Sequence, residues 1–108
     1  MMHASLENGR WAEMSFPQQM ANIGSETSRV LKALQSGKDS RAESAFARAQ
    51  ELIDLTIKYG RRDNKEMRSA MFLELCRFRE LFCSAVLLRD FSALISLNKY
   101  LDQFAMVK

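Results

Sequence analysis

Residues 63–88 read DNKEMRSAMFLELCRFRELFCSAVLL. As one helix, this stretch is apolar around most of its circumference, and at about 100° per residue its polar side chains fall on one narrow strip: Glu66, Ser69, Arg77, Glu80 and Ser84. Such a helix needs neighbours on several sides. The stretch therefore predicts an all-α fold in which this helix is the most buried and the other segments pack around it.

The chain before this stretch predicts two more helices. The first begins at Ser15, which forms a capping box with Gln18, and ends before Gly37. Gly24 lies beside its apolar stripe and costs about 1 kcal/mol of helix stability relative to alanine, which a close helix crossing would explain. The stripe has spacings of three and four residues and comprises Phe16, Met20, Ile23, Thr27, Val30 and Leu34.

The second helix is expected to begin at Asp39 or Ser40, with Ser40 and Glu43 as a second capping box, and to end at Gly60. Its inner face comprises Ala42, Ala45, Phe46, Ala49, Leu52, Ile53 and Thr56. A last helix is expected after a tight turn near residues 89–91, because Asp90 is a good N-cap. Its inner face comprises Phe91, Leu94, Leu97, Leu101 and Phe104.

Together these segments predict an up-and-down four-helix bundle with short connections, formed by residues 15–108 as a single domain. Residues 1–14 show no sustained period and are expected to form a mobile N-terminal tail. Trp11 is the exception, and we expect it to dock on the bundle as a packing anchor; stacking on a ligand is the lesser alternative.

Composition indicates a cytoplasmic protein. The chain has 108 residues, of which 47% are hydrophobic, and a net charge of +3, which is too small by itself to indicate a nucleic-acid partner. Cys76 and Cys83 would lie roughly 10 Å apart on one helix, too far for a disulfide, so reduced thiols are expected. No apolar run approaches the roughly 18 residues of a membrane span, so no membrane partner is expected.

Two charged residues lie on the apolar side of the central helix. Arg79 falls among apolar neighbours, and Glu74 falls beside Phe78. Because a buried charge without a partner costs several kcal/mol, Arg79 must reach solvent, pair with Asp54 or Glu26, or meet a subunit or ligand. Arg79 and Glu74 are therefore candidate interface residues.

A basic cluster around the second turn is the other candidate site. It comprises Lys58, Arg61, Arg62, Lys65 and Arg68. Such a patch can neutralise phosphates, which makes nucleic-acid binding an alternative function. The same residues are also explained as a solvated loop with charges at the helix ends, without a binding function. No helix-turn-helix signature accompanies them that would favour nucleic-acid binding.

The sequence does not favour catalysis. His3 is the only histidine, which removes Ser-His and Cys-His nucleophiles unless the tail folds back. Glu51 and Asp54 form a lone acidic pair, and the Glu-x-x-His pairs of di-iron bundles are absent. We therefore expect no metal and no cofactor, and the sequence leans against enzymatic activity without deciding it. An unrecognised carboxylate site is the remaining enzymatic alternative.

The chain resembles a group of small uncharacterised bacterial helical proteins from clostridia and their relatives. The similarity lies in residues 11–16 (WAEMSF), 19–26 (QMANIGSE), 51–57 (ELIDLTI), 74–80 (ELCRFRE) and 96–101 (SLNKYL). These proteins carry a longer polar connection before their last segment, which this chain lacks. The group has no assigned activity, so the resemblance implies a helical architecture and no function.

The apolar circumference of residues 67–88 exceeds what so small a chain is expected to cover. We therefore expect a non-enzymatic interaction protein that is a homo-oligomer or binds another protein. Nucleic-acid binding through residues 58–68 is the alternative.

Overall fold

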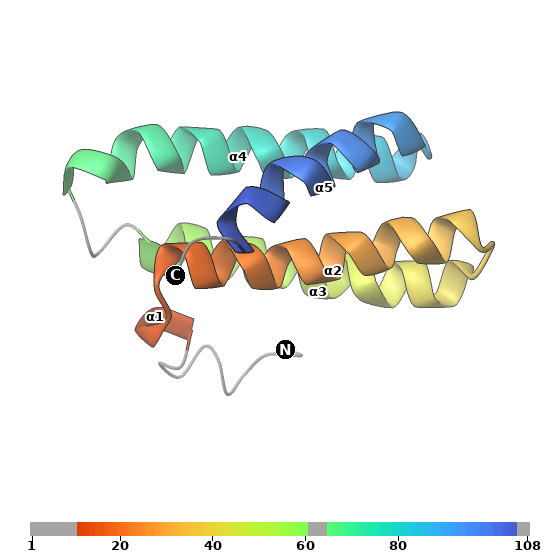
Figure 1. Cartoon of the computed structure of the whole chain (residues 1–108), viewed down its shortest axis with the longest axis horizontal. Helices are drawn as coiled ribbons and strands as arrows, with labels where there is room; N and C mark the ends of the chain where they lie inside the picture. The colour runs from red at the N-terminus through yellow and green to blue at the C-terminus, as the bar shows by residue number, and fades with distance from the viewer. Residues whose placement is uncertain (1–10, 61–64, 106–108) are drawn as a thin grey trace.

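The computed structural model describes residues 11–60 and 65–105, which form a short helix and four longer ones. The elements are α1 (Trp11–Glu13), α2 (Phe16–Gln35), α3 (Asp39–Gly60), α4 (Lys65–Leu87) and α5 (Phe91–Ala105). Successive long helices run in opposite directions, and α5 crosses obliquely between α4 and α2 (Figure 1). The predicted four-helix bundle is confirmed.

Local sequence signals explain where α2 and α3 begin and end. The Ser15–Gln18 capping box is present at the start of α2. At the end of α2, Gly37 adopts φ 69°, and the amides of Gly37 and Lys38 bond back to the carbonyls of Leu34 and Ala33. α3 then begins at Asp39, so Ser40 lies inside its first turn and the predicted second capping box at Ser40 and Glu43 is wrong.

The turn between α4 and α5 has the same hydrogen-bond pattern without a glycine. The amides of Arg89 and Asp90 bond back to the carbonyls of Val86 and Ala85, and Arg89 adopts φ 52°. The Asp90 side chain then accepts a hydrogen bond from the Ala93 amide and caps α5. The expected turn near residues 89–91 is confirmed, although an arginine occupies the left-handed position.

The helix at the centre of the bundle is α2, not α4. The most extensive helix contacts are those of α2 with α3 and with α5. Its buried apolar residues include Met20, Ile23, Val30 and Leu34. The prediction that residues 63–88 form the most buried helix is therefore wrong, because over residues 73–87, where its side chains are described, α4 buries one side and exposes the other.

Trp11 is a packing anchor, as expected, and its side chain is 1% exposed. Its indole N–H donates to Thr56 Oγ1 over 3.0 Å, and its carbonyl accepts from Gln19 Nε2 over 2.7 Å. Met14 also packs against the core. Residues 1–10 of the predicted tail lie outside the described residues.

None of the helices in the described part of the chain is both long enough and apolar enough to cross a membrane.

Candidate interaction site

The outer side of α4 presents leucines to solvent. Leu73, Leu81, Leu87 and Leu88 are 67%, 52%, 79% and 75% exposed, respectively. The opposite side of the helix carries the buried residues Leu75, Phe78, Phe82 and Ala85. We call the solvent side the α4 outer face, which consists of Leu73, Arg77, Glu80, Leu81, Ser84, Leu87 and Leu88.

Two opposite charges lie in the middle of the α4 outer face. Arg77 and Glu80 are both exposed, and neither forms an ion pair with another described residue. They are three residues apart and therefore project from the same side of the helix. The face thus combines apolar ends with a central charge of each sign.

The predicted interface residue Arg79 has a partner within the chain. Its Nη1 lies 2.6 Å from Asp54 Oδ1 on α3, and the two side chains are 42% and 60% exposed. Of the two counter-ions considered from the sequence, the structure brings Asp54 to Arg79, whereas Glu26 pairs with Arg29. Because the pair is partly solvated, it contributes about 0–1 kcal/mol to stability.

Glu74, the other predicted interface residue, accepts a hydrogen bond from the Tyr100 hydroxyl of α5. Burial raises the pKa of Tyr100 above its ordinary range, and the hydrogen bond to Glu74 and the charge of that carboxylate raise it further. Glu74 therefore links α4 to α5 and does not belong to the α4 outer face.

The predicted basic cluster falls mostly outside the described residues. Arg61 and Arg62 lie in the undescribed connection. Lys65 and Arg68 lie in α4, but the structure describes only the backbone at these two positions. Lys58 is exposed in the last turn of α3. Whether these five side chains form one surface stays a prediction.

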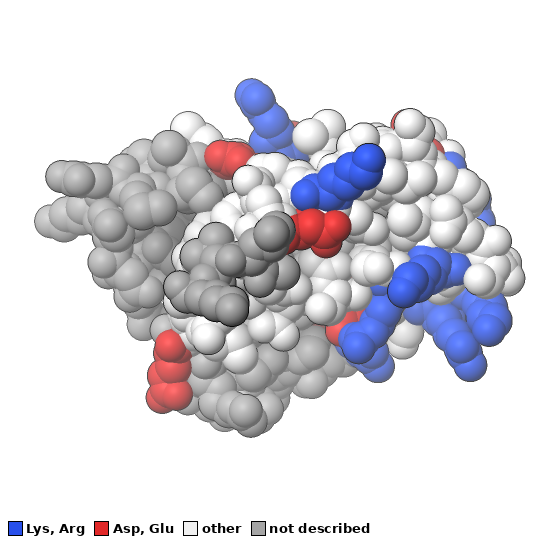
Figure 2. Space-filling view, viewed as in Figure 1, with Lys and Arg blue, Asp and Glu red and all other residues white. Residues whose placement is uncertain are grey.

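A different group of cations gathers at the other end of α3. A groove of about 430 Å³ runs between α2 and α3 beside the turn that connects them, and the cations that line it are Arg29, Lys32, Lys38, Arg41 and Arg48. Figure 2 shows Lys and Arg collected over this end of the two helices. The buried side chains of Ala33 and Ala45 also line the groove, with the hydroxyls of Ser36 and Ser44. We call it the basic groove.

The arrangement of α2 and α3 explains why these cations meet. Arg29 and Lys32 lie three residues apart on α2, and Ser36, its C-cap, follows four residues later. On α3, Arg41, Ala45 and Arg48 have the same three- and four-residue spacing. In an antiparallel hairpin, residues before the turn lie opposite residues after it, so the two rows face each other. The sequence alone does not reveal the groove, because its cations come from two helices and are not close together along the chain.

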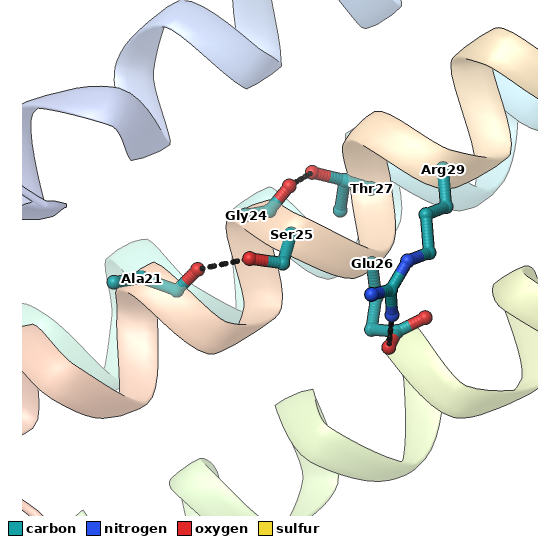
Figure 3. Close-up of polar contacts among 6 residues, drawn as sticks. All are labelled: Ala21, Gly24, Ser25, Glu26, Thr27 and Arg29. Carbon is teal, nitrogen blue, oxygen red and sulfur yellow. Dashed lines mark hydrogen bonds and ion pairs between the residues drawn. The ribbon is translucent and has the colours of Figure 1, made fainter.

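One groove cation is partly neutralised. Arg29 Nη1 lies 2.5 Å from Oε1 of Glu26, whose side chain is 10% exposed. Figure 3 shows Arg29 bent back onto Glu26 along α2. The second oxygen of that carboxylate is buried and has no hydrogen-bond partner among the described residues, so Glu26 depends on Arg29 for compensation.

The described residues contain no group of three or more His, Cys, Asp or Glu side chains that could hold a metal ion. Cys76 and Cys83 are both free and half-buried, and Cys83 Sγ accepts a hydrogen bond from Gln50. His3 lies outside the described residues.

No family model, curated protein or solved structure that was compared with the chain matches it. The resemblance to the small clostridial proteins therefore stays a prediction.

Proposed function

We propose that this protein is a non-enzymatic interaction module that self-associates through the α4 outer face. The observation that carries the proposal is the exposure of Leu73, Leu81 and Leu87 on the side of α4 that holds Arg77 and Glu80, continued by the exposed Leu88 in the turn that follows. Contiguous apolar surface with a polar component is typical of protein-binding sites.

The distribution of charge favours a second copy of this chain as the partner. Consider two α4 helices packed antiparallel about a two-fold axis between Glu80 and Leu81. Leu73 of each chain then lies opposite Leu88 of the other, because a two-fold interface repeats each contact. Arg77 lies opposite Ser84 of the second copy. Glu80 of that copy is one helical turn from Ser84, within reach of the long Arg77 side chain. The face is thus complementary to itself in both apolar contact and charge.

The energy of this contact is sufficient for reversible association. Complete burial of a leucine side chain stabilises by about 1.5–3 kcal/mol. A dimer brings together the four leucines of each chain, whereas association costs about 4–15 kcal/mol in lost freedom. Partial burial of the eight leucines is therefore of the same order as this cost.

Light scattering during size-exclusion chromatography tests the proposal over a concentration series. We expect the mass of a dimer for the wild type at high micromolar concentration and of a monomer for Leu73→Gln/Leu88→Gln. Glutamine has nearly the helix propensity of leucine, so the helix is preserved. Ile95→Gln is the control, because Ile95 is an exposed apolar residue on α5, outside the α4 outer face. A wild type that stays monomeric contradicts the proposal. So does an Ile95→Gln variant that becomes monomeric to the same extent as the double variant.

A further inference from the structure

We infer that the basic groove binds the phosphate backbone of a nucleic acid. The inference rests on the α2–α3 end of the molecule and is independent of the α4 outer face.

The groove concentrates positive charge in one place. The chain has a net charge of +3, with 16 Lys and Arg against 13 Asp and Glu. The five cations of the groove exceed this net charge, so the rest of the chain is net acidic. A polyanion is therefore drawn to this end of α2 and α3.

Only one cation of the groove pairs with a carboxylate among the described residues. None of the residues that line it is acidic. Asp39 and Glu43 are on α3 but project from another side of it than Arg41, and Asp39 Oδ1 lies 3.2 Å from Arg89 Nη2. The nearest buried carboxylate, Glu26, engages Arg29. Lys32, Lys38, Arg41 and Arg48 consequently have no described ion-pair partner.

The chemistry of the lining favours phosphates over bases. Arginine and lysine donate to phosphate oxygens, and the hydroxyls of Ser36 and Ser44 add two further donors. No aromatic side chain lines the groove, so bases have no surface on which to stack. Arg41 and Arg48 are separated by about 10 Å along the helix, so they can contact two different phosphates of one strand. Binding is therefore expected to be independent of sequence.

The number of free cations sets the expected salt dependence. Four unpaired cations that neutralise four phosphates give a slope of log K against log salt of about −3 for a single strand and about −4 for a duplex. Each cation that is replaced by a neutral side chain is expected to reduce the magnitude of this slope by about 1. Arg29 is left unchanged in the test because its removal would leave Glu26 buried without compensation.

Fluorescence anisotropy with the full chain tests the inference, between about 50 and 200 mM salt. The probes are a labelled single-stranded RNA, a labelled DNA duplex and a labelled poly-glutamate peptide of similar length. We expect the protein to bind the RNA, the duplex or both. In the Arg41→Gln/Arg48→Gln variant, the slope of log K against log salt is expected to be smaller in magnitude by about 2. Lys99→Gln, an exposed lysine on α5, is the control and is expected to leave the slope unchanged.

Three results would overturn the inference. The first is failure to bind either nucleic acid. The second is equal or tighter binding of poly-glutamate, which would identify an acidic polypeptide as the partner. The third is loss of binding on Arg61→Gln/Arg62→Gln without loss in the groove variant, which would assign the binding to residues 58–68. The mass measurements above are unaffected by any of these results.

Discussion

Gly24 and Leu101 meet where α2 crosses α5, and a Cβ added to Gly24 would lie only 3.3 Å from the Cβ of Leu101. The Leu101 Cβ is attached directly to the α5 backbone and cannot rotate away. Glycine therefore permits the close approach of the two helices that its position in the sequence predicts.

Gly24→Ala is expected to destabilise the protein by about 1 kcal/mol, measured by urea unfolding. Alanine gains about 1 kcal/mol of helix propensity, whereas overpacking at a helix crossing costs about 1–3 kcal/mol. Ser25→Ala is the control, because Ser25 is exposed on the same helix turn and gains propensity without a clash (Figure 3). If Gly24→Ala stabilises as Ser25→Ala does, the crossing is not tight.

The Trp11–Thr56 hydrogen bond is expected to couple α1 to α3. Thr56→Val keeps the shape of the side chain but leaves the indole N–H buried without an acceptor, which costs about 1–3 kcal/mol. In the Trp11→Phe background the same substitution should cost less, since no donor remains. A double-mutant cycle of unfolding free energies measures this difference, and strictly additive costs would show that the bond contributes nothing.

The left-handed conformation of Arg89 predicts that glycine is tolerated better than alanine at this position. Arg89→Gly and Arg89→Ala both remove the ion pair with Asp39, but only glycine adopts φ 52° without strain. The glycine variant should be more stable than the alanine variant by about 1 kcal/mol in urea unfolding. An equal stability of the two variants would mean that the turn relaxes out of this conformation.

Tyr100 predicts a loss of stability at alkaline pH. Its pKa is raised in the folded protein, so the folded state keeps the phenol proton when the unfolded chain releases it near pH 10. The contribution of this group is therefore complete below about pH 10 and decreases as the pH rises above that value. Unfolding measured at several alkaline pH values should show a steeper decline for the wild type than for Tyr100→Phe. Parallel declines would contradict the raised pKa.

Helix positions could be predicted from this sequence because their signals are local. The Ser15–Gln18 cap, Gly37 and Asp90 each act within one turn of chain, and the apolar stripe of α2 follows its periodicity. The burial of α4 cannot be predicted in the same way, because periodicity shows which residues are apolar but not whether a neighbour covers them. Leu73 and Phe78 look alike in the sequence, and only the packing of α3 and α5 separates them.

The candidate sites were less predictable, because they depend on contacts between distant segments. The sequence indicates that Arg79 needs a partner, but only the packing of α3 beside α4 selects Asp54 over Glu26. The basic groove requires the register of the α2–α3 hairpin, which brings Arg29 and Arg48 to one surface. Hydrophobic spacing determines such a register only after the turn is known.

The most direct test of self-association through the α4 outer face exchanges the central charges. Arg77→Glu gives a chain with two acidic residues at positions 77 and 80, and Glu80→Arg gives a chain with two basic ones. Each variant alone is expected to be monomeric because like charges meet across the two-fold axis, and an equimolar mixture is expected to form a heterodimer. Sedimentation velocity distinguishes these states. Dimers of either variant alone, or a mixture that stays monomeric, would contradict the account.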